Sequence, residues 1–296
     1  MKILFTGGSS FSGYWFIKTL VSAGHHLTVP LKREKNFYEG VRAKRVEKLL
    51  PLCSVIENAP LGSDAFNHLI ETTSWDLFCH HAADVTDYKS PDFNPIRALE
   101  NNTNSLIKAL SGGHIKRFLL TGSVFEKAEG KGDTQQAISP YGLSKSLTSL
   151  YLHYYCDLYK IPFSKFIIPN PFGPYEEAKY AAYLMKQWLS KESVHIQTPD
   201  YIRDNIPIDL LSLAYLDCVQ NGNEHMHPSG YVGSQAAFTE KFALEMRSRL
   251  HLPCHYTSAL QIHFSEPLMR VNTESQLKHP SWSENHFWDS VATYYQ

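Results

Sequence analysis

The 296-residue sequence has few cysteines, no long apolar run and almost no net charge. Its five cysteines are odd in number, scattered and never spaced as C-x-x-C, which predicts reduced thiols rather than a disulfide framework. Only three apolar residues separate Lys2 from Thr6, too few for a signal peptide, and no uncharged apolar run approaches the roughly 20 residues of a membrane span. The formal net charge of −1 argues against a protein built mainly to bind nucleic acid or an anionic membrane. These absences predict a cytoplasmic protein.

The first half of the chain alternates strand-like and helix-like segments. Short β-rich runs occur at 2–5, 26–31, 53–57, 75–80, 117–120 and 163–168. Helical patterns separate several of them, at 14–23, 65–72, 94–110 and 143–160. Such alternation implies right-handed crossovers and a parallel sheet covered on both faces. The sequence therefore predicts an α/β fold with a Rossmann-like doubly wound parallel sheet.

The regular alternation fades after Pro169, where two prolines and a glycine fall within residues 169–173. We therefore predict a dinucleotide-binding domain over 1–168 and a smaller C-terminal lobe over 169–296 that mainly binds substrate. Segments at about 202–220 and 260–273 are expected to return to the first domain and complete its sheet.

The stretch TGGSSFSG at residues 6–13 directly follows the first predicted strand. A turn that leads into a helix presents backbone N–H groups to phosphate, and its glycines let the backbone approach a pyrophosphate closely. Strand, turn and helix occur in the required order, although Ser10 stands where the middle glycine usually falls. The residues expected to hold the cofactor here are Gly7, Ser9, Ser10, Phe11, Ser12 and Gly13.

The end of the second predicted strand carries Leu31, Lys32 and Arg33. An NAD site usually has an acid there that accepts hydrogen bonds from the ribose hydroxyls, whereas two cations suit a 2′-phosphate. The hydroxyls of Ser9 and Ser10 are expected to donate to the same phosphate. We therefore predict NADP as the cofactor, with NAD as the alternative. Beyond Arg33, the basic segment up to Lys48 is expected to be a solvated helix face.

Three Tyr-x-x-x-Lys patterns occur, and four residues make about one helical turn, which places both side chains on one face. A neighbouring ammonium favours tyrosinate and prepares the phenol for proton exchange. The pattern at 14–18 belongs to the predicted phosphate-binding helix, and the one at 175–179 lies in a loop-like segment. Tyr141 and Lys145 instead open a long helix shortly after a strand that ends at Ser123. We therefore predict Tyr141 and Lys145 as the catalytic pair, with Ser123 nearby.

Six motifs in this order resemble the extended short-chain dehydrogenase/reductase family, specifically its nucleotide-sugar epimerases, dehydratases and reductases. They are TGGSSFSG, HHAA at 80–83, LLTGSVFE at 119–126, SPYGLSK at 139–145, IPNPFGPYEE at 168–177 and YIRDNIPIDLL at 201–211. The resemblance covers nearly the whole chain.

This resemblance implies roles for the catalytic residues. Tyr141 would act as general acid and base on a sugar hydroxyl or ketone. Lys145 would lower the pKa of Tyr141 and hydrogen-bond the nicotinamide ribose. Ser123 would hydrogen-bond the reacting oxygen of the substrate, since a hydroxyl both donates and accepts.

The resemblance also implies binding residues. Ala82 and Ala83 would line the cofactor, and Asn170 would help place the nicotinamide and the sugar. Arg203 and Arg270 would bind a nucleotide diphosphate, because a planar guanidinium fits phosphate bidentately. Either arginine could instead be a structural ion-pair partner.

These features favour an NADPH-dependent reductase of a nucleotide-linked 4-keto sugar. The alternative is a nucleotide-sugar 4-epimerase that retains its NAD(P). A dehydratase is disfavoured because Val124 and Phe125 stand where such enzymes of the family carry an Asp-Glu pair. A non-catalytic cofactor-binding or sensor protein is a further hypothesis. The chain keeps Ser123, Tyr141 and Lys145 together, which argues against it.

The expected partners are a nucleotide-sugar substrate and a second copy of the chain. In the resembled family, helices corresponding to the apolar segment 147–158 pair two subunits, which implies a homodimer. We expect neither nucleic acid nor a membrane as partner. No metal is expected either, because adjacent His80 and His81 would point to opposite faces of a strand, and Pro253 separates His251 from His255.

Overall fold

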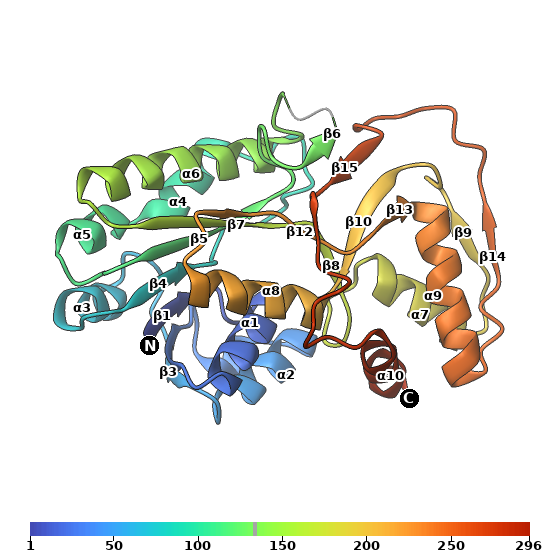
Figure 1. Ribbon diagram of the computed structural model, residues 1–296, viewed down its shortest axis with the longest axis horizontal. Helices are drawn as coiled ribbons and strands as arrows, with labels where there is room; N and C mark the ends of the chain where they lie inside the picture. The colour runs from blue at the N-terminus through green and yellow to red at the C-terminus, as the bar shows by residue number, and fades with distance from the viewer. Residues whose placement is uncertain (133–134) are drawn as a thin grey trace. The chain divides into compact units, whose positions relative to one another are not determined.

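The computed structural model describes residues 1–132 and 135–296, which divide into two compact units (Figure 1). Among these residues, the first unit holds 1–129, 135–168 and 215–226. The second unit holds 130–132, 169–214 and 227–296. No helix in the described ranges is long and apolar enough to cross a bilayer.

The first unit is built on a seven-stranded parallel sheet with the order β11-β7-β5-β4-β1-β2-β3. Its strands are Lys2–Thr6 (β1), His26–Pro30 (β2), Ser54–Ile56 (β3), Leu77–His80 (β4), Phe118–Ser123 (β5), Phe163–Ile168 (β7) and His225–Met226 (β11). The strand order reverses beside β1, because β2 pairs one edge of β1 and β4 pairs the other. The predicted Rossmann-like doubly wound fold is confirmed, and ligands of such sheets bind where the order reverses.

Helices cover both faces of this sheet (Figure 1). One face carries Asp64–Thr72 (α3), Pro95–Thr103 (α4), Leu106–Ser111 (α5) and Pro140–Leu158 (α6). The other carries Phe11–Ser22 (α1), Gly40–Leu49 (α2) and the second half of Ile208–Asn221 (α8). The 3-10 turn Lys35–Phe37 (η1) precedes α2 in the chain. The single helix predicted over 94–110 is wrong, because Ser105 adopts a left-handed φ of 62° and separates α4 from α5.

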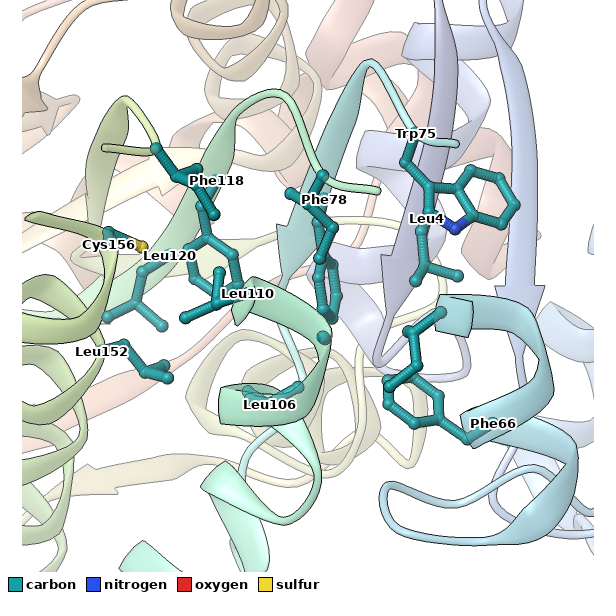
Figure 2. Close-up of a cluster of buried hydrophobic side chains, with 14 residues drawn as sticks. Leu4, Phe66, Trp75, Phe78, Leu106, Leu110, Phe118, Leu120, Leu152 and Cys156 are labelled. Carbon is teal, nitrogen blue, oxygen red and sulfur yellow. The ribbon is translucent and has the colours of Figure 1, made fainter. Parts of the chain in front are cut away.

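A cluster of buried apolar side chains joins the sheet to α3, α5 and α6 (Figure 2). Phe118 and Leu120, two residues apart on β5, point to this face because side chains alternate along a strand. They meet Leu110 and Leu152 from the helices. Burying a side chain of this size stabilises the fold by about 1.5–3 kcal/mol.

The opposite face of the sheet is packed with aromatic rings. Phe16 of α1 stacks on Tyr215 of α8 with ring centroids 4.0 Å apart and an interplanar angle of 6°. Phe166 of β7 meets the same Tyr215 ring edge-on at 4.9 Å. All three side chains are fully buried. The residues 215–226 therefore complete the core of the first unit.

The second unit contains a five-stranded sheet of order β13-β10-β15-β6, with β8 also paired to β10. Its strands are Lys131–Gly132 (β6), Asn170–Phe172 (β8), Ile202–Pro207 (β10), Tyr231–Ser234 (β13) and Met269–Val271 (β15). Two further strand pairs join Val194–Ile196 (β9) to Tyr256–Ser258 (β14) and Pro228–Ser229 (β12) to Glu274–Ser275 (β16). The helices are Tyr180–Leu189 (α7), Gln235–Leu250 (α9) and Glu284–Tyr295 (α10).

Of the segments expected to return to the first domain, residues 215–220 lie in the first unit, whereas residues 202–214 and 260–273 lie in the second. β10 and β15, from the expected segments 202–220 and 260–273, pair with each other in the second unit. The first sheet instead gains β11, which lies between the two segments. Every strand offers the same backbone donors and acceptors, so a local sequence pattern does not specify which sheet a strand joins.

Candidate active site

Residues 7–13 run from the end of β1 through a turn into the first residues of α1. Gly7 has a φ of 78°, and a Cβ at this position would lie 2.8 Å from the backbone nitrogen of Ala82. A Cβ at Gly13 would lie 2.4 Å from the carbonyl oxygen of Gly7, so both positions require glycine. The turn holds backbone close to backbone at the N-terminus of α1, whose first N–H groups attract phosphate. This cradle fits the diphosphate of a dinucleotide.

Ser10 closes this turn with its side chain. Its hydroxyl donates to the Gly7 carbonyl at 2.8 Å and accepts the Gly13 N–H at 3.1 Å, which caps α1. A hydroxyl has one proton, and here Gly7 receives it. Donation to a 2′-phosphate would require the Ser10 hydroxyl to leave the Gly7 carbonyl, and it stays a prediction. Serine replaces the middle glycine because its side chain locks the turn.

Arg45 of α2 reaches the same turn and is fully buried. Its Nε donates to the Ser9 carbonyl at 3.0 Å. Sequence analysis missed this residue because it treated the basic segment beyond Arg33 as a solvated face. The available signal is the spacing of four residues between Arg45 and the fully buried Leu49, which places both on one face of α2.

The predicted cofactor-selecting residues lie just after β2. Lys32 and Arg33 are exposed, and Leu31 is buried. The backbone of Leu31 bonds both Ile56 and Ala59, which fixes the chain where it leaves the sheet. The two cations therefore stand in solvent beside the end of β2, and their preference for a 2′-phosphate stays a prediction.

The start of α6 packs tightly against the loop after β5. Ser139 caps the helix by accepting the Gly142 N–H at 3.1 Å, and Pro140 fits the first helical position. A Cβ at Gly142 would lie 2.1 Å from the Phe125 carbonyl oxygen, so glycine permits this approach. The packing sets Tyr141 in the first turn of α6 beside the loop that begins at Ser123.

Lys145 lies one turn further along α6 and is buried. Its Nζ donates to the Thr121 carbonyl of β5 at 2.5 Å. Burial lowers the pKa of Lys145 to about 8, with the Glu126 carboxylate acting against this and Lys165 adding to it. The ammonium therefore titrates near neutral pH.

The pKa of Tyr141 is raised, first by burial and then by the negative charge of Glu126 and by Tyr88. The ring is enclosed edge-on by Tyr88 at 5.3 Å and by Phe93 and Phe125 at 6.0 Å each. The expected lowering of this pKa by Lys145 is wrong for this structure. Helical spacing places the two residues on one face, but the flexible lysine chain extends to a carbonyl of β5 instead.

The HHAA motif ends β4 next to the glycine turn. Thr6 Oγ1 lies 3.0 Å from His80 Nδ1 and accepts the N–H groups of His81 and Ala82, both at 3.2 Å. Burial, with a further contribution from the Lys145 charge, lowers the pKa of each histidine to about 3. Both imidazoles are therefore neutral at physiological pH. Ala82 and Ala83 follow them in the chain, and the Ala82 backbone lies beside Gly7.

A buried charge cluster that sequence analysis missed lies under Ser123. Glu126 Oε1 accepts the Ser123 N–H at 2.8 Å, and Glu126 Oε2 lies 2.6 Å from Lys165 Nζ. The same Nζ donates to Glu129 at 2.6 Å, and Glu129 contacts His225 at 3.2 Å. Burial alone would lower the pKa of Lys165, but the two carboxylates outweigh it and raise the pKa. The available signal was a lysine within the largely apolar strand FSKFII.

The second unit brings Arg203 and Arg270 together, since they pair in register between β10 and β15. One oxygen of Glu266 lies 3.0 Å from Arg203 Nη2 and 3.2 Å from Arg270 Nη1. Arg203 also donates to the Leu268 carbonyl at 3.2 Å, and its guanidinium lies 4.3 Å from the Tyr201 ring centre. Both predicted diphosphate ligands therefore have an acidic partner, Glu266, that sequence analysis missed.

The motif IPNPFGPYEE places Asn170 and Glu176 in the second unit. Asn170 begins β8, pairs in register with Asn205 and is half-buried. Glu176 is buried in the loop before α7, and burial raises the pKa of its carboxyl to about 8, although Lys179 acts in the opposite direction. Within the described residues its Oε2 has no hydrogen-bond partner.

The protonation of Glu176 gives a pH dependence to stability. Its folded pKa of about 8 lies above the ordinary 4.5, so its full contribution is present below about pH 4.5 and is lost as pH rises through about 8. Glu176→Gln is therefore expected to stabilise the protein by on the order of 3 kcal/mol at pH 8.5 and much less at pH 5. Urea unfolding at both pH values measures this. Glu192→Gln, at an exposed position, is the control and should show no such difference.

The fold of the first unit, with Ser123, Tyr141 and Lys145 at the ends of β5 and α6, defines an extended short-chain dehydrogenase/reductase. Residues 3–216 match the model of the NAD dependent epimerase/dehydratase family. The chain belongs to that family, which confirms the predicted enzyme class. No curated protein sequence matches the chain.

Solved structures of similar fold cover nearly all of the chain. The UDP-glucose 4-epimerase of Thermotoga maritima, solved with UDP-glucose, is 19% identical, with a TM-score of 0.75 over 100% of this chain and 98% of its own. A variant of the UDP-glucuronic acid 4-epimerase of Bacillus cereus, solved with a fluorinated UDP-sugar and NAD, is 17% identical, with a TM-score of 0.77 over 100% and 99%. The UDP-N-acetylglucosamine 4-epimerase of Methanobrevibacter ruminantium is 16% identical, with a TM-score of 0.74 over 99% and 97%. At these identities the likeness concerns the fold.

Proposed function

We propose that this protein is a nucleotide-sugar 4-epimerase that keeps NAD bound through its catalytic cycle. The observation that carries the proposal is the grouping of Ser123, Tyr141 and Lys145 in the first unit, together with the glycine turn at 7–13. The three structural relatives described above are 4-epimerases of UDP-sugars, which supports this reaction over the NADPH-dependent reduction favoured by the sequence alone.

In this proposal the residues of the chain move one proton and hold the reacting groups. Tyr141 takes the proton from the C4 hydroxyl of the sugar and later returns it to the same oxygen. Ser123 hydrogen-bonds that oxygen. For this step the Lys145 Nζ leaves the Thr121 carbonyl, to which it donates here, and its ammonium stabilises the deprotonated phenol. Bound NAD supplies the acceptance and return of the C4 hydride. Because the hydride and the proton both return, the reaction needs no external oxidant or reductant.

In the second unit, we assign Arg203 and Arg270 to the diphosphate of the substrate and Asn170 to the sugar. Two adjacent guanidiniums suit a diphosphate, and both are already directed at an anionic oxygen, that of Glu266. A carboxylate held between two arginines indicates that their geometry accommodates an anion. In this assignment the diphosphate takes over contacts that Glu266 makes.

The choice between NAD and NADP is tested separately. NAD is supported by the family, whereas the exposed Lys32 and Arg33 favour NADP. Binding of both dinucleotides to Lys32→Ala and Arg33→Ala should leave NAD affinity within about twofold of wild type. Selective loss of NADPH affinity in these variants would instead revive the NADP assignment.

The proposed reaction is tested with the purified protein. The nucleotide released on denaturation should be NAD, and UDP-glucose, UDP-glucuronic acid and UDP-N-acetylglucosamine should be screened without added cofactor. Formation of the C4 epimer from at least one of them, followed by proton NMR, is the expected result. Stoichiometric NADPH consumption with a 4-keto sugar nucleotide, without any isomerisation, would show the reductase instead.

We also propose that α6 pairs two copies of the chain. Leu150 and Tyr154 on this helix are 69% and 64% exposed, and Leu158 is 54% exposed. They adjoin a hollow lined by Leu99, Leu147, Leu150, Tyr151, Tyr154 and Tyr155. A continuous apolar face of this kind is typical of an interface.

Leu150→Glu is expected to convert a dimer into a monomer, because it places a charge at the centre of this face. Sedimentation velocity at micromolar concentration measures the change. Leu244→Glu, at an equally apolar but separate position on α9, should leave the dimer intact. A monomeric wild-type protein would contradict the proposed dimer.

A further inference from the structure

We propose that Glu126 is a positioning residue for the reaction, fixing the Ser123 backbone and supplying the negative charge that keeps Lys145 cationic. The inference rests on the proposed function, since it assigns Ser123 and Lys145 to the catalytic group. Glu126 acts through these residues and not on the substrate.

The first half of the inference is geometric. The Glu126 side chain accepts the Ser123 N–H at 2.8 Å, and the Glu126 N–H donates to the Ser123 carbonyl at 3.0 Å. Glu126 therefore binds both polar groups of the Ser123 backbone. The Ser123 Oγ also accepts the Phe125 N–H at 3.3 Å within the same turn. A side chain held in this way has little freedom to leave its position.

Glu126 and its cationic partner Lys165 are both buried. Glu126 is 1% exposed and Lys165 is 8% exposed, and charges at such positions persist only when they are paired. A Cβ at Gly122 would lie 2.8 Å from Glu126 Oε1 and 2.9 Å from Lys165 Cε. The glycine therefore leaves room for both side chains to lie against the backbone of β5. Removing Glu126 outright would leave Lys165 with Glu129 as its carboxylate partner and would leave the Ser123 N–H without its acceptor.

The second half of the inference is electrostatic. Lys165 lies between Glu126 and Glu129, so one cation meets two carboxylates, and His225 contacts Glu129 as well. Glu126 raises the pKa of Lys145 and of Tyr141, which identifies it as the anion that both groups sense.

The other groups facing Lys145 do not supply this charge. From β4 and the residue after it come His80 and His81, both neutral with a pKa of about 3. From β7 comes Lys165, whose positive charge lowers the pKa of Lys145. Tyr141, on the same helix, is protonated because its pKa is raised. Among these groups, Glu126 is therefore the one that raises the pKa of Lys145.

The test is the charge-neutral variant Glu126→Gln, whose amide oxygen can still accept the Ser123 N–H. Its alkaline limb of kcat against pH should move down by about one unit, because Lys145 loses its proton earlier. This corresponds to a roughly fivefold lower kcat at pH 8, with KM for the nucleotide sugar within about twofold of wild type. Glu129→Gln is the matched control, since Glu129 pairs with the same Lys165 but does not bond Ser123.

A second variant separates position from charge. Glu126→Asp keeps the carboxylate but shortens the side chain by one methylene, which withdraws the acceptor from Ser123. Its kcat should fall about tenfold or more while its alkaline limb stays at the wild-type pH. Wild-type kcat in Glu126→Asp overturns the positioning role, and this holds even if Glu126→Gln does not fold.

A direct titration keeps the inference independent of turnover. The Lys145 ammonium can be followed by NMR on protein carrying carbon-13 at lysine Cε, with Lys145→Arg identifying its signal. Its midpoint should move to lower pH in Glu126→Gln and stay in Glu129→Gln. An unchanged midpoint, or an equal shift in both variants, overturns the inference. Failure of wild type to epimerise any nucleotide sugar would count against the proposed function alone.

Discussion

Tyr141→Phe is expected to lower kcat for epimerisation by about 10³-fold, because it removes the hydroxyl that exchanges a proton with the sugar. The ring itself is retained, so its edge-on contacts with Tyr88, Phe93 and Phe125 should persist and the protein should stay folded. The amount of bound cofactor should remain that of wild type. Steady-state isomerisation rates and the absorbance of released dinucleotide measure both quantities.

The control for this variant comes from another Tyr-x-x-x-Lys pattern. Tyr175 has a φ of 67° in a loop, and Lys179 only precedes α7, so this pair does not share a helix face. Tyr175→Phe should keep kcat within about twofold of wild type. Wild-type turnover by Tyr141→Phe would remove the basis of the catalytic assignment.

Gly13→Ala is expected to weaken dinucleotide binding by more than about 100-fold. The added methyl would lie 2.4 Å from the Gly7 carbonyl oxygen and 2.7 Å from Ser10 Oγ, far inside van der Waals contact. Because one neighbour is backbone, the turn has to open, and the cradle for the diphosphate is lost. Isothermal titration with NAD measures the loss, and circular dichroism checks that the fold persists.

A matched glycine variant distinguishes this clash from a general effect of the substitution. Gly233 in β13 has only ordinary contact for an added Cβ, with the Ala237 Cβ at 3.7 Å. Gly233→Ala should bind the cofactor as wild type does. If Gly13→Ala also binds NAD normally, the turn at 7–13 does not hold the diphosphate.

The sheet of the first unit was predictable because its strands are buried on both faces and are separated by helices. The run before Thr6 and the strand ending at Ser123 are both apolar segments that can be recognised from the sequence alone. The membership of β10 and β15 in a separate sheet was not predictable, since backbone pairing does not depend on side-chain identity.

The candidate site was predictable where a short stretch of sequence contains all the residues of a motif. The glycine turn and the spacing of Tyr141 and Lys145 are of this kind. Glu126 and Glu266 were missed because the role of an acidic residue depends on the cation that it pairs with. Glu126 pairs with Lys165 and Glu266 with Arg203, and both cations are distant from their acids in the sequence. The direction of the Lys145 side chain was missed for a related reason, since helical spacing does not say which carbonyl a long chain reaches.

The stacking of Tyr215 on Phe16 has a consequence for how the chain folds during synthesis. The ribosome releases α1 and β7 well before Tyr215, so the nascent first unit presents Phe16 and Phe166 without their covering ring. Its core can close only after the intervening segment 169–214 has emerged and the chain has returned. A fragment ending at residue 168 should therefore be prone to aggregate, and no single cut would separate two independently folding halves.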